Sequence, residues 1–180
     1  MASTLLEKPA VAAADSAERQ VVALHLGQEI YGVDISLIHS VLTPQPITTV
    51  PNVPSFVLGV MNLRGRILPV LDLRTRFGMP PLDDEKKRLS RIVIVEAAGL
   101  TAGLVVDAVS EVLTLSVGSI EPPSALLGSS DLRCLTGIGR VGNKSNKENE
   151  KKEEGRLILL LDIVETLTSV AALTSHVDVE

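Results

Sequence analysis

The hydrophobic positions of this chain fall into short runs with a period near two, separated by glycine, proline and charged residues. Such runs, rich in Val, Ile and Leu, are typical of β-strands. Two apolar segments, at 35–42 and 163–173, have the spacing of short helices, and Asp34 and Asp162 stand where they can cap them. Asp72 is placed to cap a further helical turn over 73–77. The strands expected are Gln20–Leu26, Ile30–Val33, Ile47–Val50, Val57–Leu63, Ile67–Leu71, Arg91–Glu96, Gly103–Val106, Val109–Leu115, Leu132–Val141 and Leu157–Leu161.

The pattern repeats within the chain. A shift of 71 positions places Val21 on Ile92, and the same shift places Ile38 on Val109. A shift of 90 places the segment 65–73, with its Gly-Arg start and its Asp, on 155–163. The difference of 19 positions is largely explained by 143–154, which holds only Asn, Lys, Ser and Glu and is expected to form an exposed hairpin loop. We therefore expect two similar β-rich lobes, at about 20–85 and 90–163, with a shared hydrophobic seam.

Composition narrows the class of protein. The chain has 180 residues, of which 45% are hydrophobic and 22% charged, so it is globular. Its net charge of −5 argues against nucleic acid as the main partner. Residues 1–18 lack the features of a signal peptide, and we interpret them as a loose tail of a cytoplasmic protein. Only three residues are aromatic, so the core must be built from aliphatic side chains.

Candidate chemistry is sparse. The segment Gly137–Gly142 spells G-x-G-x-x-G, which resembles a dinucleotide-binding fingerprint, but the polar segment after it cannot supply the required amphipathic helix. The three histidines are not spaced as metal ligands. His25 is expected on a strand and His39 on a helix, both near the surface, and the single Cys134 is interpreted as a buried structural residue. The pattern favours a binding module over an enzyme, with no cofactor and no metal.

Several segments resemble the CheW family, the adaptor proteins of bacterial chemosensory arrays. The match runs from about 19 to 169 and is carried by the segments Gly59–Leu73, Tyr31–Ile35, Gly103–Leu113 and Leu135–Gly139. The resemblance implies a mainly all-β fold: two SH3-like five-stranded β-barrel lobes sharing a hydrophobic core, with short helices and a C-terminal helix at 163–174. One CheW-like domain would then occupy 19–175.

The resemblance also implies partners. Family members couple the cytoplasmic tips of methyl-accepting chemotaxis receptors to the histidine kinase CheA, whose regulatory domain pairs with them barrel to barrel, and they are recruited to membrane arrays only through these partners. The expected kinase interface includes Gly59, Gly137 and Gly139. The expected receptor groove lies between the lobes, with Arg64 as the orienting charge. Its apolar walls are assigned to Ile38, Val41, Val109 and Val112.

Two departures from the family pattern bear on partner choice. Asn62 and Gly65 are expected to shape the turn that holds Arg64, yet Ser40 stands where relatives often carry a Glu that faces this arginine. Arg64 then either lacks a partner acid or uses another one. The charged segment 143–154 is also longer than expected. The alternatives left open are an adaptor of a non-flagellar chemosensory pathway, a regulatory fragment of a larger kinase chain, and a nucleotide-binding protein or enzyme using Gly137–Gly142.

Overall fold

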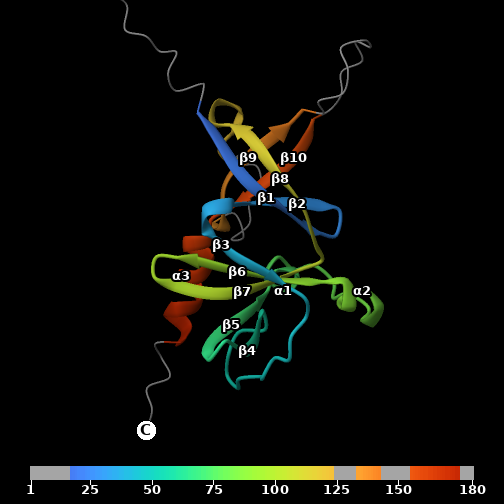
Figure 1. Cartoon of the computed structure of the whole chain (residues 1–180), viewed down its shortest axis with the longest axis vertical. Coiled ribbons are helices and arrows are strands. Elements are labelled where there is room, and N and C mark those ends of the chain that lie inside the picture. The colour runs from blue at the N-terminus through green and yellow to red at the C-terminus, as the bar shows by residue number, and fades with distance from the viewer. Residues whose placement is uncertain (1–16, 124–132, 143–154, 175–180) are drawn as a thin grey trace, which may run out of the picture.

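Strands make up most of the regular secondary structure, as a computed structural model shows for residues 17–123, 133–142 and 155–174 (Figure 1). The ten strands are β1 (Glu18–Leu26), β2 (Glu29–Asp34), β3 (Ile38–Leu42), β4 (Val57–Leu63), β5 (Arg66–Asp72), β6 (Arg91–Ala97), β7 (Leu100–Val106), β8 (Ala108–Ser116), β9 (Leu135–Val141) and β10 (Arg156–Leu161). The helices are α1 (Leu73–Arg76), α2 (Asp84–Leu89) and α3 (Ile163–Thr174).

The strands form two five-stranded sheets. The first sheet has the order β8-β1-β2-β10-β9, and the second has the order β3-β6-β7-β5-β4. The first occupies the upper part of the molecule in Figure 1 and the second the lower part, with α3 beside the second. The expected mainly-β fold with two five-stranded units and a C-terminal helix is confirmed.

The predicted lobe boundaries are wrong, because the sheets do not divide the chain at residues 85–90. The first sheet joins β1 and β2 to β8, β9 and β10, whereas the second consists of β3 to β7. Under the internal repeat, β1, β2, β3 and β5 correspond to β6, β7, β8 and β10. The strands β4 and β9 correspond by their pairing, since they lie beside β5 and β10 in the two sheets. Each sheet therefore combines the first hairpin of one repeat with the last three strands of the other.

Strand register supports the repeat at the level of single residues. Val22 lies opposite Val112 in the first sheet, and its counterpart Val93 lies opposite Val41 in the second. The parallel pairs follow the same rule: Gly32 faces Leu160, and Gly103 faces Val70. The two halves of the molecule thus have equivalent topologies, which makes each position comparable with a partner position in the other sheet.

Alternation along the strands sends side chains into three hydrophobic clusters. On β1, Val21 and Ala23 enter a cluster inside the first sheet, while Val22, Leu24 and Leu26 enter a large cluster between the two sheets. Met61, Leu68 and Ile92 belong to a third cluster, inside the second sheet. Burying one such aliphatic side chain contributes roughly 1.5–3 kcal/mol. The shared cluster therefore makes each sheet depend on the other, as the expected common core requires.

Local predictions were correct for the hairpins and wrong at three connections. The segment 35–42 is not a helix: a 3₁₀ turn at Ile35–Leu37, capped by Asp34, leads directly into β3, so His39 lies on a strand. The segment 47–50 contributes only an isolated bridge between Thr48 and Val60. No helix was expected at Asp84–Leu89, yet α2 forms there, and the side chain of Asp83 caps it by accepting a hydrogen bond from Lys86 N.

Candidate functional site

The strands β3 and β8 are edge strands, and both turn one face toward the space between the sheets. On β3, Ile38 lies opposite Val95 and Val41 lies opposite Val93. Val93 and Val95 belong to the cluster between the sheets, so Ile38 and Val41 share its side of the second sheet. On β8, Val109 and Val112 stand opposite Leu24 and Val22 of the same cluster. The four aliphatic residues expected in the groove are therefore all on inter-sheet faces.

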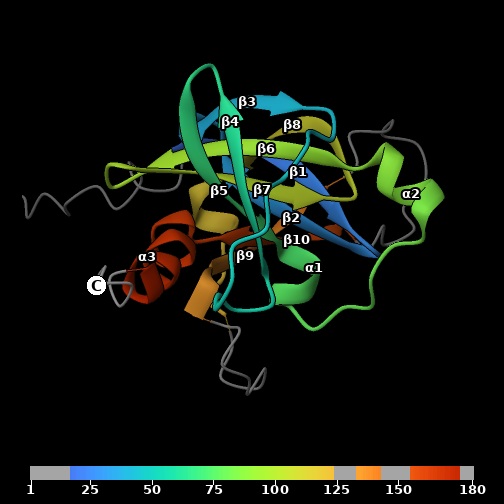
Figure 2. The same cartoon turned by 90° about the horizontal axis from the view of Figure 1, so that it is seen from below.

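These four residues differ in exposure in a symmetric way. Ile38 and Val109 are partly buried and pack against the shared cluster. Val41 and Val112 remain 43% and 51% exposed. Val41 and Val112 are therefore not part of a closed core. Ile35, which is 40% exposed on the turn before β3, adds a further exposed apolar side chain that the sequence analysis did not single out. Figure 2 shows β3 and β8 on the same side of the molecule.

Arg64 sits at the tip of the β4–β5 hairpin. Arg64 and Gly65 both have positive φ angles, of 52° and 83°, which is the geometry of a two-residue type I′ turn. The side-chain oxygen of Asn62 accepts a hydrogen bond of 2.8 Å from Gly65 N and closes this turn. Asn62 and Gly65 therefore both shape the turn that holds Arg64. The turn leaves the Arg64 side chain exposed.

The Arg64 side chain lines a hollow of about 260 Å³ beside the cluster inside the second sheet, since Leu68 and Ile94 of that cluster also line it. His39 and Ser40 from β3 and Glu96 from β6 also line it. In the described part of the chain Arg64 makes no salt bridge, and Ser40, which was expected to stand in place of an acid, gives it no charged partner. Glu96 is the acid nearest to that role, since it shares the hollow with the arginine. Sequence reasoning missed Glu96, which is 32 positions further along the chain.

The three glycines assigned to the kinase interface are buried against this chain itself. Gly59 has a φ angle of 144°, and a Cβ atom there would lie 2.0 Å from the carbonyl oxygen of Thr48. Gly137, its counterpart in the repeat, would place a Cβ 2.7 Å from Ile120 and 3.0 Å from the carbonyl oxygen of Glu121. A Cβ at Gly139 would meet Leu115. These glycines therefore allow close packing within the chain itself, and a side chain such as that of Gly59→Asp should disturb the fold.

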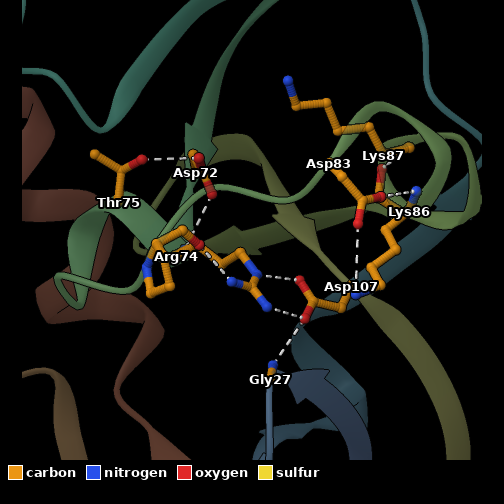
Figure 3. Close-up of polar contacts among 10 residues, drawn as sticks. Gly27, Asp72, Arg74, Thr75, Asp83, Lys86, Lys87 and Asp107 are labelled. Atoms are coloured by element: carbon orange, nitrogen blue, oxygen red, sulfur yellow. Dashed lines mark hydrogen bonds and ion pairs between the residues drawn. The ribbon is translucent and has the colours of Figure 1, made fainter.

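A polar clasp joins the two sheets on the side of α1 (Figure 3). Arg74 Nε and Nη2 donate to the two carboxylate oxygens of Asp107 at 2.7 and 2.8 Å, and Gly27 N donates to the same carboxylate at 2.7 Å. Arg74 also donates to the carbonyl oxygen of Pro80. Gly27 belongs to the β1–β2 turn of the first sheet, whereas Arg74 follows β5 of the second, so the clasp fixes the sheets relative to each other.

The clasp sets the ionisation of its own groups. Burial by itself would raise the pKa of Asp107, but the hydrogen bonds from Arg74 and Gly27 outweigh it and hold the pKa below its ordinary value. The hydrogen bond with Asp107 raises the pKa of Arg74. Both shifts favour the charged forms, so the pair is an ion pair at neutral pH.

Asp72 and Asp162 each cap the start of a helix. The Asp72 carboxylate accepts hydrogen bonds from Arg74 N at 3.0 Å and from Thr75 Oγ1 at 2.8 Å. The Asp162 carboxylate accepts a hydrogen bond of 2.9 Å from Glu165 N at the start of α3. Both carboxylates are thus occupied by capping bonds at equivalent helix starts, as the repeat predicts.

Comparison with known proteins decides the family. Residues 20–171 match the CheW-like domain family. The chain belongs to this family. The protein named "Probable chemotaxis protein CheW" from Rhizobium etli is 35% identical over 123 residues, covering 68% of this chain and 77% of that protein. Chemotaxis protein CheW of Klebsiella aerogenes is 29% identical over 157 residues, covering 87% and 86%. The crystal structure of the scaffolding protein TtCheW from Thermoanaerobacter tengcongensis superposes with a TM-score of 0.67 at 36% identity, covering 82% and 90%.

Membership of the CheW-like family agrees with the interpretation of this chain as a binding module, since the family is one of non-catalytic scaffolds and adaptors. Cys134 is buried, as expected, and accepts a contact of 3.4 Å from Arg76 Nη2. Within 17–123, 133–142 and 155–174, no cluster of three His, Cys, Asp or Glu side chains can hold a metal ion. No helix in these ranges is long and apolar enough to cross a membrane.

The glycines of the G-x-G-x-x-G segment do not precede a helix. Gly137 and Gly139 lie inside strand β9, where they pair with Leu160 and Ile158 of β10. A dinucleotide fingerprint needs its glycines in the turn between a strand and a helix, so that the phosphates meet the helix N-terminus. The nucleotide-binding alternative is therefore not favoured by the geometry. The charged segment 143–154 lies outside the described residues.

Proposed function

We propose that this chain is a non-catalytic chemotaxis adaptor that couples methyl-accepting chemoreceptors to the histidine kinase CheA. The match over nearly the whole domain and the similarity to a CheW scaffold support this role. In this proposal the chain acts in the cytoplasm and joins a membrane-bound receptor array through its partners, with no membrane insertion of its own.

The receptor's helical tip binds in the groove between the sheets. The observation that carries this assignment is the exposure of Val41 and Val112, two equivalent valines on facing edge strands beside the shared core. An amphipathic helix can bury its apolar anchors against such paired walls. Ile38 and Val109 form the inner part of these walls, and Arg64, at the outer edge of β3, orients the helix by binding an acid or a carbonyl oxygen.

The experiment is co-sedimentation of purified variants with receptor-containing membranes. Val112→Arg and Val41→Arg place a charge in the groove and should each reduce receptor binding about tenfold or more, because a charged side chain buried in an apolar contact is costly. Leu89→Arg is the matched control, since Leu89 is a 65% exposed apolar residue on α2. Thermal unfolding checks each fold. Normal receptor binding by folded Val112→Arg and Val41→Arg proteins would remove the groove from the proposal.

The regulatory domain of CheA binds a barrel end. Gly59, Gly137 and Gly139 contribute to this surface by allowing chain segments to pack closely over β4 and β9, so that they shape the ends without contacting the kinase. The receptor-groove variants should therefore retain kinase binding in a pull-down. Loss of kinase and receptor binding together, in a folded Val112→Arg protein, would show that the two sites overlap.

A second candidate within the same class is an adaptor for a chemosensory pathway with an output other than flagellar rotation. Ser40 is the observation that favours it, because the acid that commonly faces Arg64 is replaced and Glu96 lies in the same hollow. Restoring the acid with Ser40→Glu should raise affinity for flagellar-type receptors in the co-sedimentation assay. Unchanged or lower affinity would indicate that the groove is adapted to a different receptor class.

A further inference from the structure

The starts of β2 and β10 diverge and leave a second apolar hollow, away from the groove between the sheets. The parallel pairing of these strands begins only at Tyr31 and Leu159. Before that point lies an open hollow of about 850 Å³. Its apolar surface comes from Ile30, Leu157 and Leu159, and Leu157 is 56% exposed. Arg140 and Arg156 stand at its rim.

The equivalent place on the second sheet is covered by a helix. There the pairing of β5 with β7 begins at Val70 and Gly103. Pro69, Leu100 and Thr101, the counterparts of Leu159, Glu29 and Ile30, lie next to Leu167, Val170 and Ala171 of α3. Only a small hollow of about 150 Å³ remains between them. The chain itself thus shows what covers this kind of surface: an amphipathic helix with apolar residues at i, i+3 and i+4.

The first sheet has no such helix because α1 ends too soon. Both helices start after a capping aspartate, and Phe77 and Leu167 are equivalent positions. Phe77 stacks on Tyr31 of the first sheet, with ring centroids 5.2 Å apart. The residue at this position is therefore packed in both halves of the molecule, as Phe77 beside the first sheet and as Leu167 beside the second. The counterparts of Val170 and Ala171 are Pro80 and Pro81, which cannot continue a helix. Helix α1 therefore has four residues where α3 has twelve.

We propose that an amphipathic helix of a partner protein binds in this hollow and completes the first sheet as α3 completes the second. The chain's own connection at 143–154 has no apolar side chain to bury there. The two arginines at the rim form only exposed ion pairs within this chain: Arg140 lies 3.7 Å from Glu121, and Arg156 lies 3.0 Å from Glu111. Such exposed pairs are weak, so both arginines can bind acidic groups of a partner. The partner helix therefore carries acidic residues beside its apolar face. This proposal does not depend on receptor or kinase binding.

The probe is a hydrocarbon-stapled helical peptide of about 15 residues, because shorter unconstrained helices are marginal in water. It carries leucines at i, i+3, i+4 and i+7 and glutamates on the flanks. One control peptide replaces the glutamates by lysines, and a second moves the leucines off the helical spacing. Fluorescence anisotropy measures the affinity, and NMR shift perturbation locates the binding site.

The variant Leu157→Asp should weaken binding of the acidic peptide about tenfold or more. Ile67→Asp is the matched control, because Ile67 is the counterpart of Leu157 on the second sheet and is 64% exposed, yet lies outside the hollow. It should leave the affinity unchanged. Arg140→Glu should weaken the acidic peptide and favour the lysine peptide, which tests the charge preference with a substitution at an exposed site.

Four outcomes would overturn the proposal. They are absence of binding, equal effects of Leu157→Asp and Ile67→Asp, equal binding by the peptide with displaced leucines, and NMR shifts confined to other surfaces. Sedimentation of the wild-type protein tests whether a second copy of the chain occupies the hollow. A dimer that dissociates in Leu157→Asp but not in Ile67→Asp would show that a second copy of the chain covers the hollow, and would also overturn the proposal.

Discussion

At the residue scale, Gly59 shows how tightly the backbone is packed at the ends of the sheets. Its φ angle of 144° is a conformation that L-residues rarely adopt, and a Cβ would lie 2.0 Å from Thr48 O. Backbone strain of this kind costs about 1–3 kcal/mol. We expect Gly59→Ala to lower the free energy of unfolding by at least that amount, because Thr48 and Val60 must also lose their mutual hydrogen bonds.

Urea denaturation of Gly59→Ala and Gly78→Ala provides the measurement. Gly78 has a φ angle of 68° with open space around it, so its substitution adds conformational strain of about 1–2 kcal/mol and no clash. Gly59→Ala should be the more destabilised of the two. Equal midpoints for the two variants would mean that the segment with Thr48 moves aside easily, and that the close approach has little structural weight.

A second residue-scale prediction concerns pH. The pKa of Asp107 is held below its ordinary value because the bonds from Arg74 and Gly27 outweigh the effect of burial. The folded protein therefore binds this proton less readily than the unfolded chain. The stability that the clasp contributes is complete above the ordinary carboxyl value near 3.9, about where the unfolded chain titrates. It is lost as pH falls through the lower folded value.

The variant Asp107→Asn tests this sign. It should lower the free energy of unfolding by about 2 kcal/mol at neutral pH, since Arg74 loses a charged hydrogen-bond partner. Urea unfolding measured from neutral pH down to about pH 3 should show a smaller acid-induced loss in the variant than in the wild type. Parallel curves for the two proteins would show that Asp107 contributes nothing to the acid sensitivity. The loss of stability in acid would then come from other carboxylates such as Asp34, whose pKa is also lowered.

At the element scale, the segment 35–42 explains why a strand was mistaken for a helix. Ile38 and Val41 are three positions apart, which is a helical spacing, and Asp34 does cap the turn before them. In β3, however, the pairing shifts between Ile38 and Ser40, so one extra residue enters the strand. Side chains on one face of a strand are normally two residues apart. The extra residue of a bulge makes this distance three residues, which equals the i, i+3 spacing of a helix. The same spacing recurs in β8, where the three steps from Val109 to Val112 face only two steps in β1, so the extra residue again lies in the edge strand.

The hairpins, by contrast, were predictable from short-range signals. Arg64-Gly65 and Ala98-Gly99 occupy two-residue turns with positive φ angles, which the neighbouring apolar runs had already indicated. The aspartate caps were predictable for the same reason, because a cap acts within three residues. The location of Glu96 beside Arg64 was not, since it depends on how β3 and β6 pair.

Helices α1 and α3 offer an element-scale prediction based on their equivalence. Phe77 stacks on Tyr31, and its counterpart Leu167 is buried in the shared cluster. We expect Leu167→Ala to cost about 2–5 kcal/mol, the range for large core side chains, and Phe77→Ala, whose side chain is only partly buried, to lie toward the lower end of that range. Thermal unfolding should show a single cooperative transition in both variants. A change below about 1 kcal/mol in either one would contradict equal structural roles for the two helices.

At the scale of the whole molecule, the sequence repeat predicted two similar units but not which strands each unit contains. The strands β1 and β6 are equivalent, so an edge strand such as β3 fits against either of them by its hydrophobic pattern. Local periodicity carries no information on this choice, because both pairings bury the same face. The shared core was therefore predictable from the sequence, whereas the exchange of strands between the units was not.

The exchange leads to a prediction about folding of the two halves. A fragment of residues 17–82 contains β1 to β5, yet β1 and β2 belong to one sheet and β3 to β5 to the other. Neither sheet is complete, and the cluster between the sheets draws residues from both halves of the chain. We therefore expect fragments 17–82 and 83–174 to be unfolded when separate, and to assemble into one native-like complex when mixed.

Circular dichroism and size-exclusion chromatography check this expectation. The mixture should recover strand signal and elute at the volume of the intact chain, and its thermal midpoint should rise with concentration, as for any association coupled to folding. Leu104→Asp in the second fragment is a suitable control, because Leu104 is fully buried in the cluster between the sheets and an unpaired charge there should prevent assembly. Cooperative unfolding of fragment 17–82 by itself would show that β1 and β2 can pair with β3 in the absence of β8. The exchange seen in the structure would then be one of two accessible arrangements, and the first repeat would be an independent folding unit.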